Sequence, residues 1–181
     1  MEQVFAPWRI EWVERSDGNA DVEGCVFCEL PGMDADREYN LVARGAEAYV
    51  LLNNYPYNPG HAMVIPHAHT GEYRDLDDAT LLSQSRLLQR TLDAIETAMK
   101  PDGFNVGYNL GGAAAGGSID DHLHAHVVPR WSGDTNFMPV VSDTKVIVEA
   151  VEATYERVHE AFAGLEGATP DGEDRAIELD V

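Results

Sequence analysis

Basic residues are scarce in this 181-residue chain: 12 lysines and arginines stand against 32 aspartates and glutamates, and only Lys100 and Lys145 are lysines. The formal net charge of −20 disfavours binding to nucleic acid polymers and to anionic membrane surfaces, because both would be repelled. At molar ionic strength the Debye length is about 3 Å, so salt would screen such a surface. The composition therefore predicts a halophilic protein, with an ordinary acidic protein as the alternative.

Long apolar runs and a disulfide framework are also missing. No apolar segment approaches the ~20 residues of a membrane span, and the N-terminus has no basic stretch before an apolar one, so we expect a cytoplasmic protein without a membrane partner. The length predicts one domain over residues 1–163, including an aromatic segment around Trp8 and Trp12. Residues 164–181 read as an acidic tail that we expect to be partly mobile.

Three histidines, His122, His124 and His126, alternate with apolar residues within the segment 121–130. In a β-strand, alternate side chains share one face and stand about 6.6 Å apart along it. The imidazoles would then point one way, and the intervening apolar side chains would pack on a core. We interpret the segment as a strand that presents imidazoles to a cleft. A surface strand that happens to carry histidines is the alternative.

A glycine-rich loop, residues 111–118, comes directly before the histidines. Glycine lets backbone N–H groups approach a phosphate closely, and Ser118 adds a hydroxyl donor. Such a loop alone is a weak signal, but its position favours a phosphate cradle. Gly117 and Ser118 are therefore candidate substrate contacts.

The spacing His-x-His-x-His followed by two apolar residues resembles the histidine triad (HIT) family of nucleotidyl hydrolases and transferases. The flanking segments 109–118 and 127–138 resemble the branch that contains diadenosine tetraphosphate phosphorylases, and the likeness extends from about Phe5 to the last helix. The resemblance implies an α+β fold: an antiparallel sheet of about five strands, a long helix packed on it and a C-terminal helix. It also implies a homodimer.

Apolar patterns and turn residues place the expected elements along the chain. Strands are expected at residues 41–44, 48–52, 60–65 and 104–109, and helices at 75–100 and 143–163. The apolar stripe of the long helix is expected to comprise Leu81, Leu88, Leu92, Ile95 and Met99. We interpret that helix as packing, without a catalytic role.

Cys25 and Cys28 have the two-residue spacing of a zinc knuckle, which needs two further ligands. The candidates are His69 and His122, whose positions match those of ligands in zinc-bearing members of the family. A redox pair is the alternative, although no thioredoxin-like pattern surrounds the cysteines. Structural zinc is the prediction we favour.

The resemblance implies covalent catalysis. A neutral imidazole, with a pKa near 6.5, is a suitable nucleophile for a phosphoryl centre that already carries negative charge. We expect His124 to attack the α-phosphate and His126 to bind phosphate oxygens, with His122 completing the triad. The candidate contacts to a nucleotide or dinucleoside polyphosphate are Asn53, His61, Asn109, Arg130 and Trp131, besides the two loop residues. For His61, a buried histidine bonded only to backbone is equally compatible with the sequence.

Several functional alternatives stay open. A phosphorylase would resolve the intermediate with inorganic phosphate and convert diadenosine tetraphosphate to ADP and ATP. A hydrolase of dinucleoside polyphosphates or nucleoside phosphoramidates would use water and release AMP. All three histidines could instead hold one catalytic zinc ion. A non-catalytic nucleotide-binding adaptor is the alternative of another class.

Overall fold

The computed structural model describes residues 24–115, 119–134 and 149–181. Its strands are β1 (Leu41–Arg44), β2 (Ala48–Leu52), β3 (Ala62–Pro66), β4 (Gly103–Tyr108), β5 (Ala125–Arg130), β6 (Ala168–Thr169) and β7 (Ile177–Leu179). Its α-helices are α2 (Val26–Glu29), α3 (Asp78–Met99) and α5 (Val151–Ala163), and short 3-10 turns span Leu30–Gly32, Tyr73–Asp75 and Gly112–Ala114. The predicted α+β fold is confirmed.

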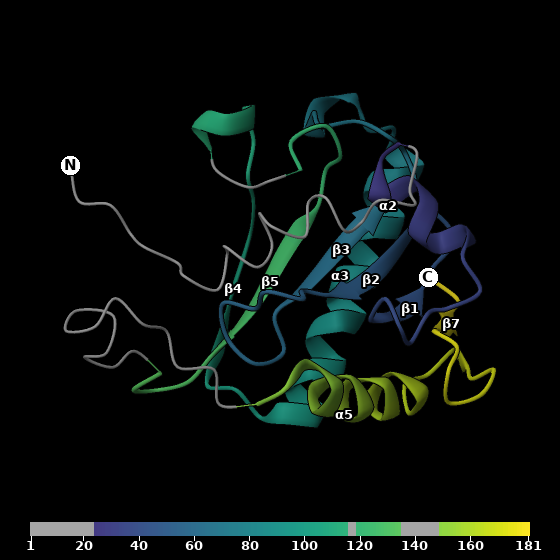
Figure 1. Ribbon diagram of the computed structural model, residues 1–181, viewed down its shortest axis with the longest axis vertical. Coiled ribbons are helices and arrows are strands. Elements are labelled where there is room, and N and C mark those ends of the chain that lie inside the picture. Colours follow the sequence, from purple (N-terminus) through teal and green to yellow (C-terminus); the bar gives the residue numbers. More distant parts are fainter. Residues whose placement is uncertain (1–23, 116–118, 135–148) are drawn as a thin grey trace.

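The strands form a seven-stranded sheet in the order β4-β5-β3-β2-β1-β7-β6 (Figure 1). All neighbouring strands are antiparallel except β1 and β7, which are parallel. The expected strands at 41–44 and 48–52 are β1 and β2, and those at 60–65 and 104–109 match β3 and β4 with small shifts. The prediction of about five strands was wrong because it left out the two C-terminal ones.

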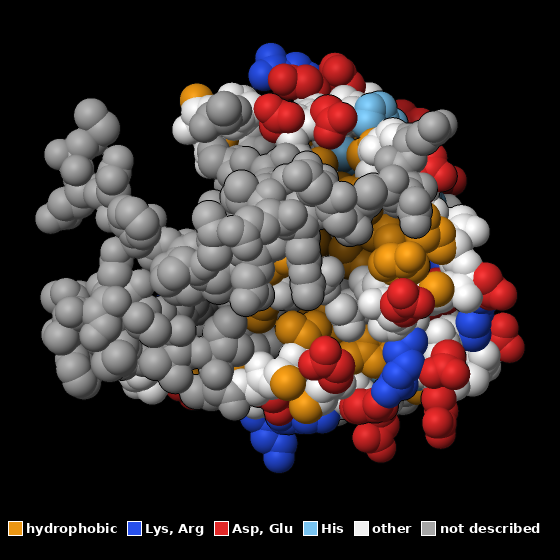
Figure 2. Space-filling model, in the orientation of Figure 1, with side chains coloured by type: hydrophobic (Ala, Val, Ile, Leu, Met, Phe, Trp, Pro, Cys, Tyr) orange, Lys and Arg blue, Asp and Glu red, His pale blue; other side chains and the backbone are white. Residues whose placement is uncertain are grey.

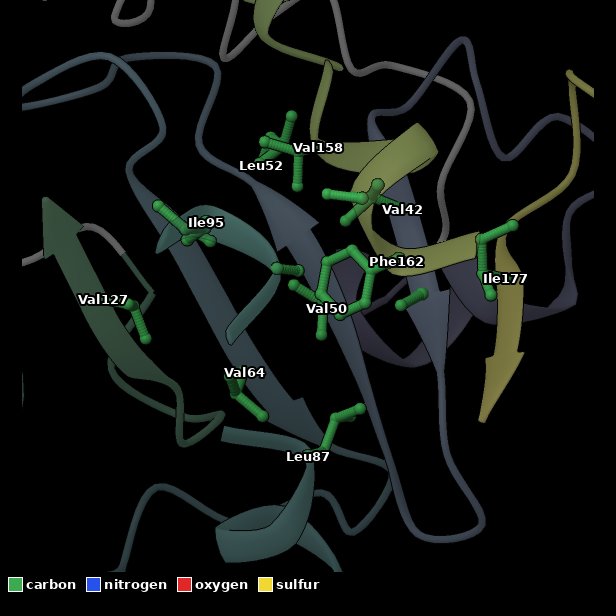
Figure 3. Packing of buried hydrophobic residues seen from close by; sticks show 14 of the residues in the cluster. Val42, Val50, Leu52, Val64, Leu87, Ile95, Val127, Val158, Phe162 and Ile177 are labelled. Atoms are coloured by element: carbon green, nitrogen blue, oxygen red, sulfur yellow. The ribbon is translucent and has the colours of Figure 1, made fainter. Parts of the chain in front are cut away.

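Alternation along the central strands gives the sheet two different faces. The helix face carries Val50 and Val64, which pack with Leu87 of α3 and Phe162 of α5 (Figure 3). On the opposite face, Tyr49 and its neighbours pack against the segment that follows Cys25. We call this the knuckle face, and its buried apolar residues include Phe27, Leu30, Tyr49, Leu51, Met63 and Ile65.

Helix α3 begins after Asp77, whose side chain accepts a hydrogen bond from the backbone N–H of Thr80. Of the expected stripe, Ile95 is buried. The other buried residues of the helix were not expected: the apolar Leu87 and Ala94 and the polar Thr80, Ser83, Gln84 and Thr91. Gln84 is tolerated there because its amide donates to the carbonyl of Val64 at 3.1 Å. Leucines 88 and 92 pack at the margin of the stripe instead.

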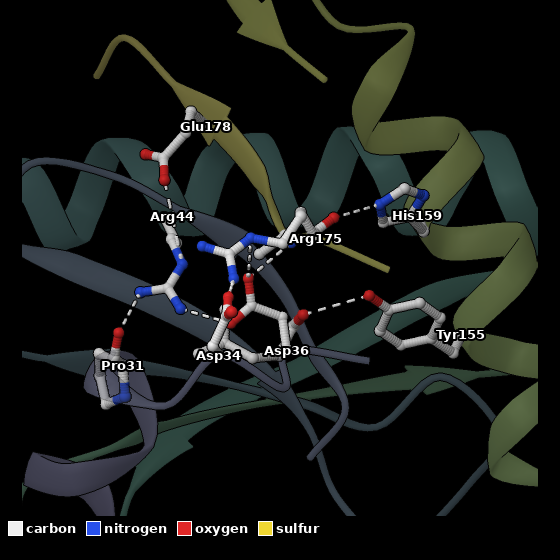
Figure 4. A network of polar contacts seen from close by, with 10 residues as sticks. Pro31, Asp34, Asp36, Arg44, Tyr155, His159, Arg175 and Glu178 are labelled. Carbon is white, nitrogen blue, oxygen red and sulfur yellow. Dashed lines mark hydrogen bonds and ion pairs between the residues drawn. The ribbon is translucent and has the colours of Figure 1, made fainter. Parts of the chain in front are cut away.

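The C-terminal residues differ from the mobile tail that we expected. Strand β7 pairs with β1, opposite Ala43, and Ile177 is fully buried. Just before it, the backbone N–H of Ala176 donates to the buried carboxylate of Asp36 at 2.9 Å. Arg44 donates to the same carboxylate at 2.5 Å (Figure 4). Strands β6 and β7 therefore extend the sheet, and a buried carboxylate with charged and backbone donors anchors the segment before β7.

Other expectations fall only partly within the described residues. The predicted helix at 143–163 appears as α5 from Val151, while residues 143–148 and the aromatic N-terminal segment lie outside the described ranges. Figure 2 shows groups of acidic side chains on the described surface of the visible face, with fewer basic ones among them. Within the described residues, no helix is long and apolar enough to cross a membrane.

Candidate functional site

The histidine segment is only partly a strand. Strand β5 begins at Ala125, so His126 lies in it, whereas His122 and His124 precede it. The predicted strand from residue 121 was too long, because the backbone N–H of Leu123 donates to the carbonyl of Thr70 in a neighbouring loop, at 2.6 Å, instead of joining the sheet. Within β5 the alternation holds, since Ala125 and Val127 pack in the core of the helix face while His126 is only half-buried.

Four potential metal ligands converge at one end of the site: Cys25, Cys28, His69 and His122. Backbone N–H groups of residues 28 and 29 bond the carbonyl of Cys25, and this turn brings the two thiols together. The His122 Nδ1 lies 3.3 Å from Cys25 Sγ, 3.5 Å from Cys28 Sγ and 3.4 Å from His69 Nδ1. The structure therefore brings together the four ligands that the sequence predicted.

The chemistry of this donor set fits a zinc ion. His122 Nε2–H donates to the carbonyl of Pro66 at 2.8 Å, which leaves a lone pair on Nδ1 facing the other three donors. Zinc–nitrogen and zinc–sulfur bonds of about 2.0–2.3 Å put tetrahedral ligand atoms roughly 3.3–3.8 Å apart. Four of the six ligand pairs here are separated by 3.3–3.5 Å, and all four atoms lie within 4.8 Å of one another. Lost solvation, and then the neighbouring Cys25, raise the pKa of Cys28 to about 11. A cation would reverse that shift by favouring the thiolate.

His124 is only 9% exposed, and its orientation leaves one ring nitrogen available for attack. The carbonyl of His122 lies 2.9 Å from Nδ1 and can only accept, so Nδ1 carries the proton and Nε2 carries the lone pair. Burial lowers the pKa of His124, and the bond to His122 opposes part of that shift. The ring is thus neutral at pH 7, as nucleophilic attack requires.

His126 is held in one tautomer by a chain of hydrogen bonds. The backbone N–H of Tyr57 donates to His61 Nδ1 at 3.1 Å, so His61 carries its proton on Nε2 and donates it to His126 Nδ1 at 3.0 Å. His126 then presents Nε2–H, 3.3 Å from Nδ2 of Asn109, and this tautomer requires the Asn109 amide to turn so that its oxygen accepts. Burial, and then His124, lower the pKa of His126 to about 4. His126 is therefore a neutral donor beside the candidate nucleophile, with its ring 4.8 Å from that of His124.

The remaining predicted contacts divide into four groups. His61 and Asn109 join the histidine cluster directly, as described above. Asn53 accepts the backbone N–H of Tyr55 at 2.8 Å and shapes the turn after β2. Gly117 and Ser118 lie outside the described ranges, so the structure does not address them.

Arg130 and Trp131 belong to a structural network at the far end of β5. The Arg130 guanidinium donates to both carboxylate oxygens of Asp134, at 2.6 and 2.8 Å, and to the side chain of Asn105 at 2.7 Å. The backbone N–H of Trp131 bonds the same carboxylate at 3.2 Å. Arg130 is thus held by protein partners, and contact with a substrate stays a prediction for both residues.

Phe27 is a residue of the site that the sequence reasoning missed. Its ring lies between the two cysteines in sequence and packs edge-on against the rings of His122 and His124. The only sequence signal was its position inside the knuckle, which reads equally well as ordinary core.

Comparison with known proteins identifies relatives of this chain. The HIT domain family model matches residues 36–133. The chain is 39% identical over 159 residues to an AP-4-A phosphorylase of Mycobacterium tuberculosis, which covers 85% of this chain and 80% of the relative. An adenosine 5'-monophosphoramidase of Schizosaccharomyces pombe is 29% identical over 106 residues, 59% of this chain and 74% of that protein.

Two solved structures share the fold. A hypothetical histidine triad nucleotide-binding protein from Sulfolobus tokodaii has a TM-score of 0.63 and 27% identity, covering 79% of this chain and 95% of its own. A Zn-bound histidine triad family protein from Mycobacterium smegmatis has a TM-score of 0.61 and 27% identity, covering 77% and 94%. Together with the family model and the curated relatives, these matches confirm the resemblance, and the chain belongs to the histidine triad (HIT) family.

Proposed function

We propose that this protein is an enzyme that transfers a nucleotidyl group from a dinucleoside polyphosphate to inorganic phosphate, with diadenosine tetraphosphate as the favoured substrate. The observation that carries the proposal is the neutral His124 ring, whose Nδ1–H is bonded to His122 and whose Nε2 lone pair faces away from that bond. The identity with an AP-4-A phosphorylase over 85% of the chain supports the substrate class and the phosphate acceptor.

In the first step, His124 Nε2 attacks the α-phosphorus, a P–N bond forms, and the P–O bond to the ATP leaving group breaks. His126 Nε2–H donates to the phosphate oxygens and stabilises their developing charge. In the second step, a phosphate oxygen attacks the same phosphorus, the P–N bond breaks, and ADP leaves with His124 again neutral. The hydrogen-bond chain through His61 keeps His126 a donor in both steps.

Phosphate dependence tests this function. Wild-type protein given diadenosine tetraphosphate and phosphate should release ADP and ATP, and it should release AMP only slowly when phosphate is omitted. Equal rates of AMP release with and without phosphate would favour a hydrolase. Hydrolysis of adenosine 5'-monophosphoramidate as the faster reaction would favour the activity for which the Schizosaccharomyces relative is named. Tight nucleotide binding without any turnover would identify an adaptor.

We also propose that Cys25, Cys28, His69 and His122 hold a structural zinc ion. The four donors converge, and the Mycobacterium smegmatis neighbour is described as zinc-bound. The ion would hold the segment after Cys25 against the histidine segment, and no reaction step needs it. Protein purified without added metal should contain about one zinc per chain, and Cys28→Ser should contain far less. Wild-type protein with as little zinc as Cys28→Ser would contradict the assignment.

A homodimer, a cytoplasmic location and adaptation to high salt remain proposals that accompany this function. Strand β4 ends the described sheet and exposes Val106, which suits contact with a second copy. Measurement of the molar mass in solution at molar salt tests the dimer.

A further inference from the structure

The ring of Phe27 connects the proposed metal site to the proposed nucleophile. The side chain is 4% exposed, and its ring centroid lies 5.6 Å from that of His122 and 5.4 Å from that of His124. The interplanar angles are 89° and 65°, so both contacts are edge-on, the arrangement that aromatic pairs favour. One side chain therefore touches a candidate metal ligand and the candidate nucleophile at the same time.

His124 needs such a contact because a single hydrogen bond does not fix a ring. The bond from Nδ1 to the carbonyl of His122 holds one atom, and the imidazole can still pivot about that bond. Two neighbouring rings restrict the pivot: Phe27 and His126, whose centroid is 4.8 Å away. The direction of the Nε2 lone pair therefore depends on where the ring of Phe27 stands.

Phe27 is itself held firmly. The buried phenol of Tyr49 in β2 donates to the Phe27 carbonyl at 2.7 Å. The ring belongs to the apolar cluster of the knuckle face together with Leu30 and Met63. On either side of it in the chain stand Cys25 and Cys28, which belong to the metal cluster. The ring cannot move away from His124 unless this anchored segment moves too.

We infer that Phe27 is a positioning residue for catalysis, which sets the orientation of the His124 imidazole and makes that orientation depend on the segment from Cys25 to Cys28. Because it is almost fully buried, Phe27 acts through His124 and offers little surface to a substrate. This role presupposes the proposed function for its effect on turnover, whereas its effect on the imidazole is independent of any substrate.

The test compares Phe27→Ala with Leu30→Ala, which removes another buried side chain of the same cluster. In Phe27→Ala, kcat for diadenosine tetraphosphate with phosphate should fall about 10²-fold, the cost of misplacing a reacting group by roughly 1 Å. The KM should change little, and the zinc content should remain that of wild type. Leu30→Ala should lose stability and keep its kcat. Phe27→Met, which restores most of the volume, should recover part of the lost kcat.

Nitrogen NMR of the imidazoles provides the second readout, which needs no substrate. Wild-type His124 should show one tautomer with the proton on Nδ1. Phe27→Ala should show an averaged signal, whereas Leu30→Ala should retain the wild-type one. If Phe27→Ala fails to fold, Phe27→Met is measured in its place.

These readouts separate the two ideas. Absence of turnover in wild-type protein would refute the proposed function, while the NMR comparison would still decide the role of Phe27. An unchanged His124 signal with an unchanged kcat in the Phe27 variants would overturn the inference. Equal losses of kcat in Phe27→Ala and Leu30→Ala would overturn it as well, by showing a general effect of packing.

Discussion

The two faces of the sheet use the same strands for opposite purposes. In β2, Val50 points to the helix face and packs among the aliphatic and aromatic side chains of α3 and α5, while Tyr49 points to the knuckle face and uses its hydroxyl to hold the Phe27 carbonyl. The helix face buries aliphatic and aromatic side chains together with uncharged polar ones such as Gln84 and Thr91, whereas the knuckle face buries imidazoles. Alternation along a strand can thus separate the residues that stabilise the fold from those that carry the chemistry.

The separation has an energetic reason. Burying an imidazole disfavours its charged form, and burial is the largest cause of the lowered pKa values of His122, His124 and His126. That cost is useful for catalysis, because it keeps the rings neutral. The helix face offsets it with fully buried side chains such as Leu87 and Phe162, each contributing about 1.5–3 kcal/mol.

The largest predicted effect is the loss of turnover when His124, the central histidine of the knuckle face, is removed. His124→Ala should lower kcat by about 10⁴-fold, because the nucleophile is gone, while the melting temperature and zinc content stay close to wild type. The matched control is His159→Ala, since His159 lies on α5 and its ring donates to the carbonyl of Arg175. That control should keep its kcat. Equal activity of His124→Ala and wild type would refute the nucleophile assignment.

Truncation of a large side chain on the helix face should have the opposite effect, a loss of stability with unchanged turnover. Phe162 is fully buried, so Phe162→Ala should lower the free energy of unfolding by about 3–5 kcal/mol through lost burial and a cavity. The folded fraction should keep the wild-type kcat, as denaturant titration and assays at low temperature can show. A loss of kcat at constant folded fraction would mean that the two faces are coupled.

Lowering the pH should destabilise the protein through protonation of His126 on the knuckle face. Its pKa is about 4 when folded and about 6.5 when unfolded, so the unfolded chain binds more protons between these values. The associated stability is present above about pH 6.5 and is lost as the pH falls toward about 4. Between about pH 7 and about pH 5 the loss is up to about 2 kcal/mol. Over the same pH range, the free energy of unfolding of His126→Asn should fall less than that of wild type, by that amount. The same pH dependence in both proteins would contradict the lowered pKa of His126.

Salt should change stability through the charged surface of the protein, and not through either buried face of the sheet. If the acidic surface is an adaptation to salt, the melting temperature should rise by about 5 °C or more from low salt to molar KCl, as screening removes repulsion. His124→Ala should show the same rise, because its surface charge is unchanged. A flat melting temperature would identify an ordinary acidic protein.

Much of this architecture could be predicted from local patterns. Strands β1 and β2 follow from their apolar runs, and the spacing of Cys25 and Cys28 indicates a metal site without knowledge of the fold. The buried stripe of α3 could not be found this way, because Gln84 is buried only where the carbonyl of Val64 in β3 accepts from its amide. That partner becomes known only when the helix packs on the sheet, whereas Thr91 donates to Leu87 one turn earlier in its own helix.

Local sequence patterns also could not reveal the contacts of the C-terminal residues or those within the site. Strand β7 is short, and its pairing with β1 depends on the distant carboxylate of Asp36, which no local pattern reveals. The partners of Arg130, Asp134 and Asn105, were not predicted either, and its contact with a substrate stays a prediction. The orientation of His124 depends on Phe27, about a hundred residues earlier in the chain.

Trapping the covalent intermediate tests the central claim most directly. Wild-type protein would be mixed rapidly with diadenosine tetraphosphate in the absence of phosphate, quenched with denaturant at alkaline pH, and digested for mass spectrometry. An adenylyl group should be found on the peptide spanning residues 121–130, at His124, and it should disappear as ADP forms when phosphate is added before the quench. Full turnover with no adenylyl group on the protein, or with the group on His126, would contradict the account.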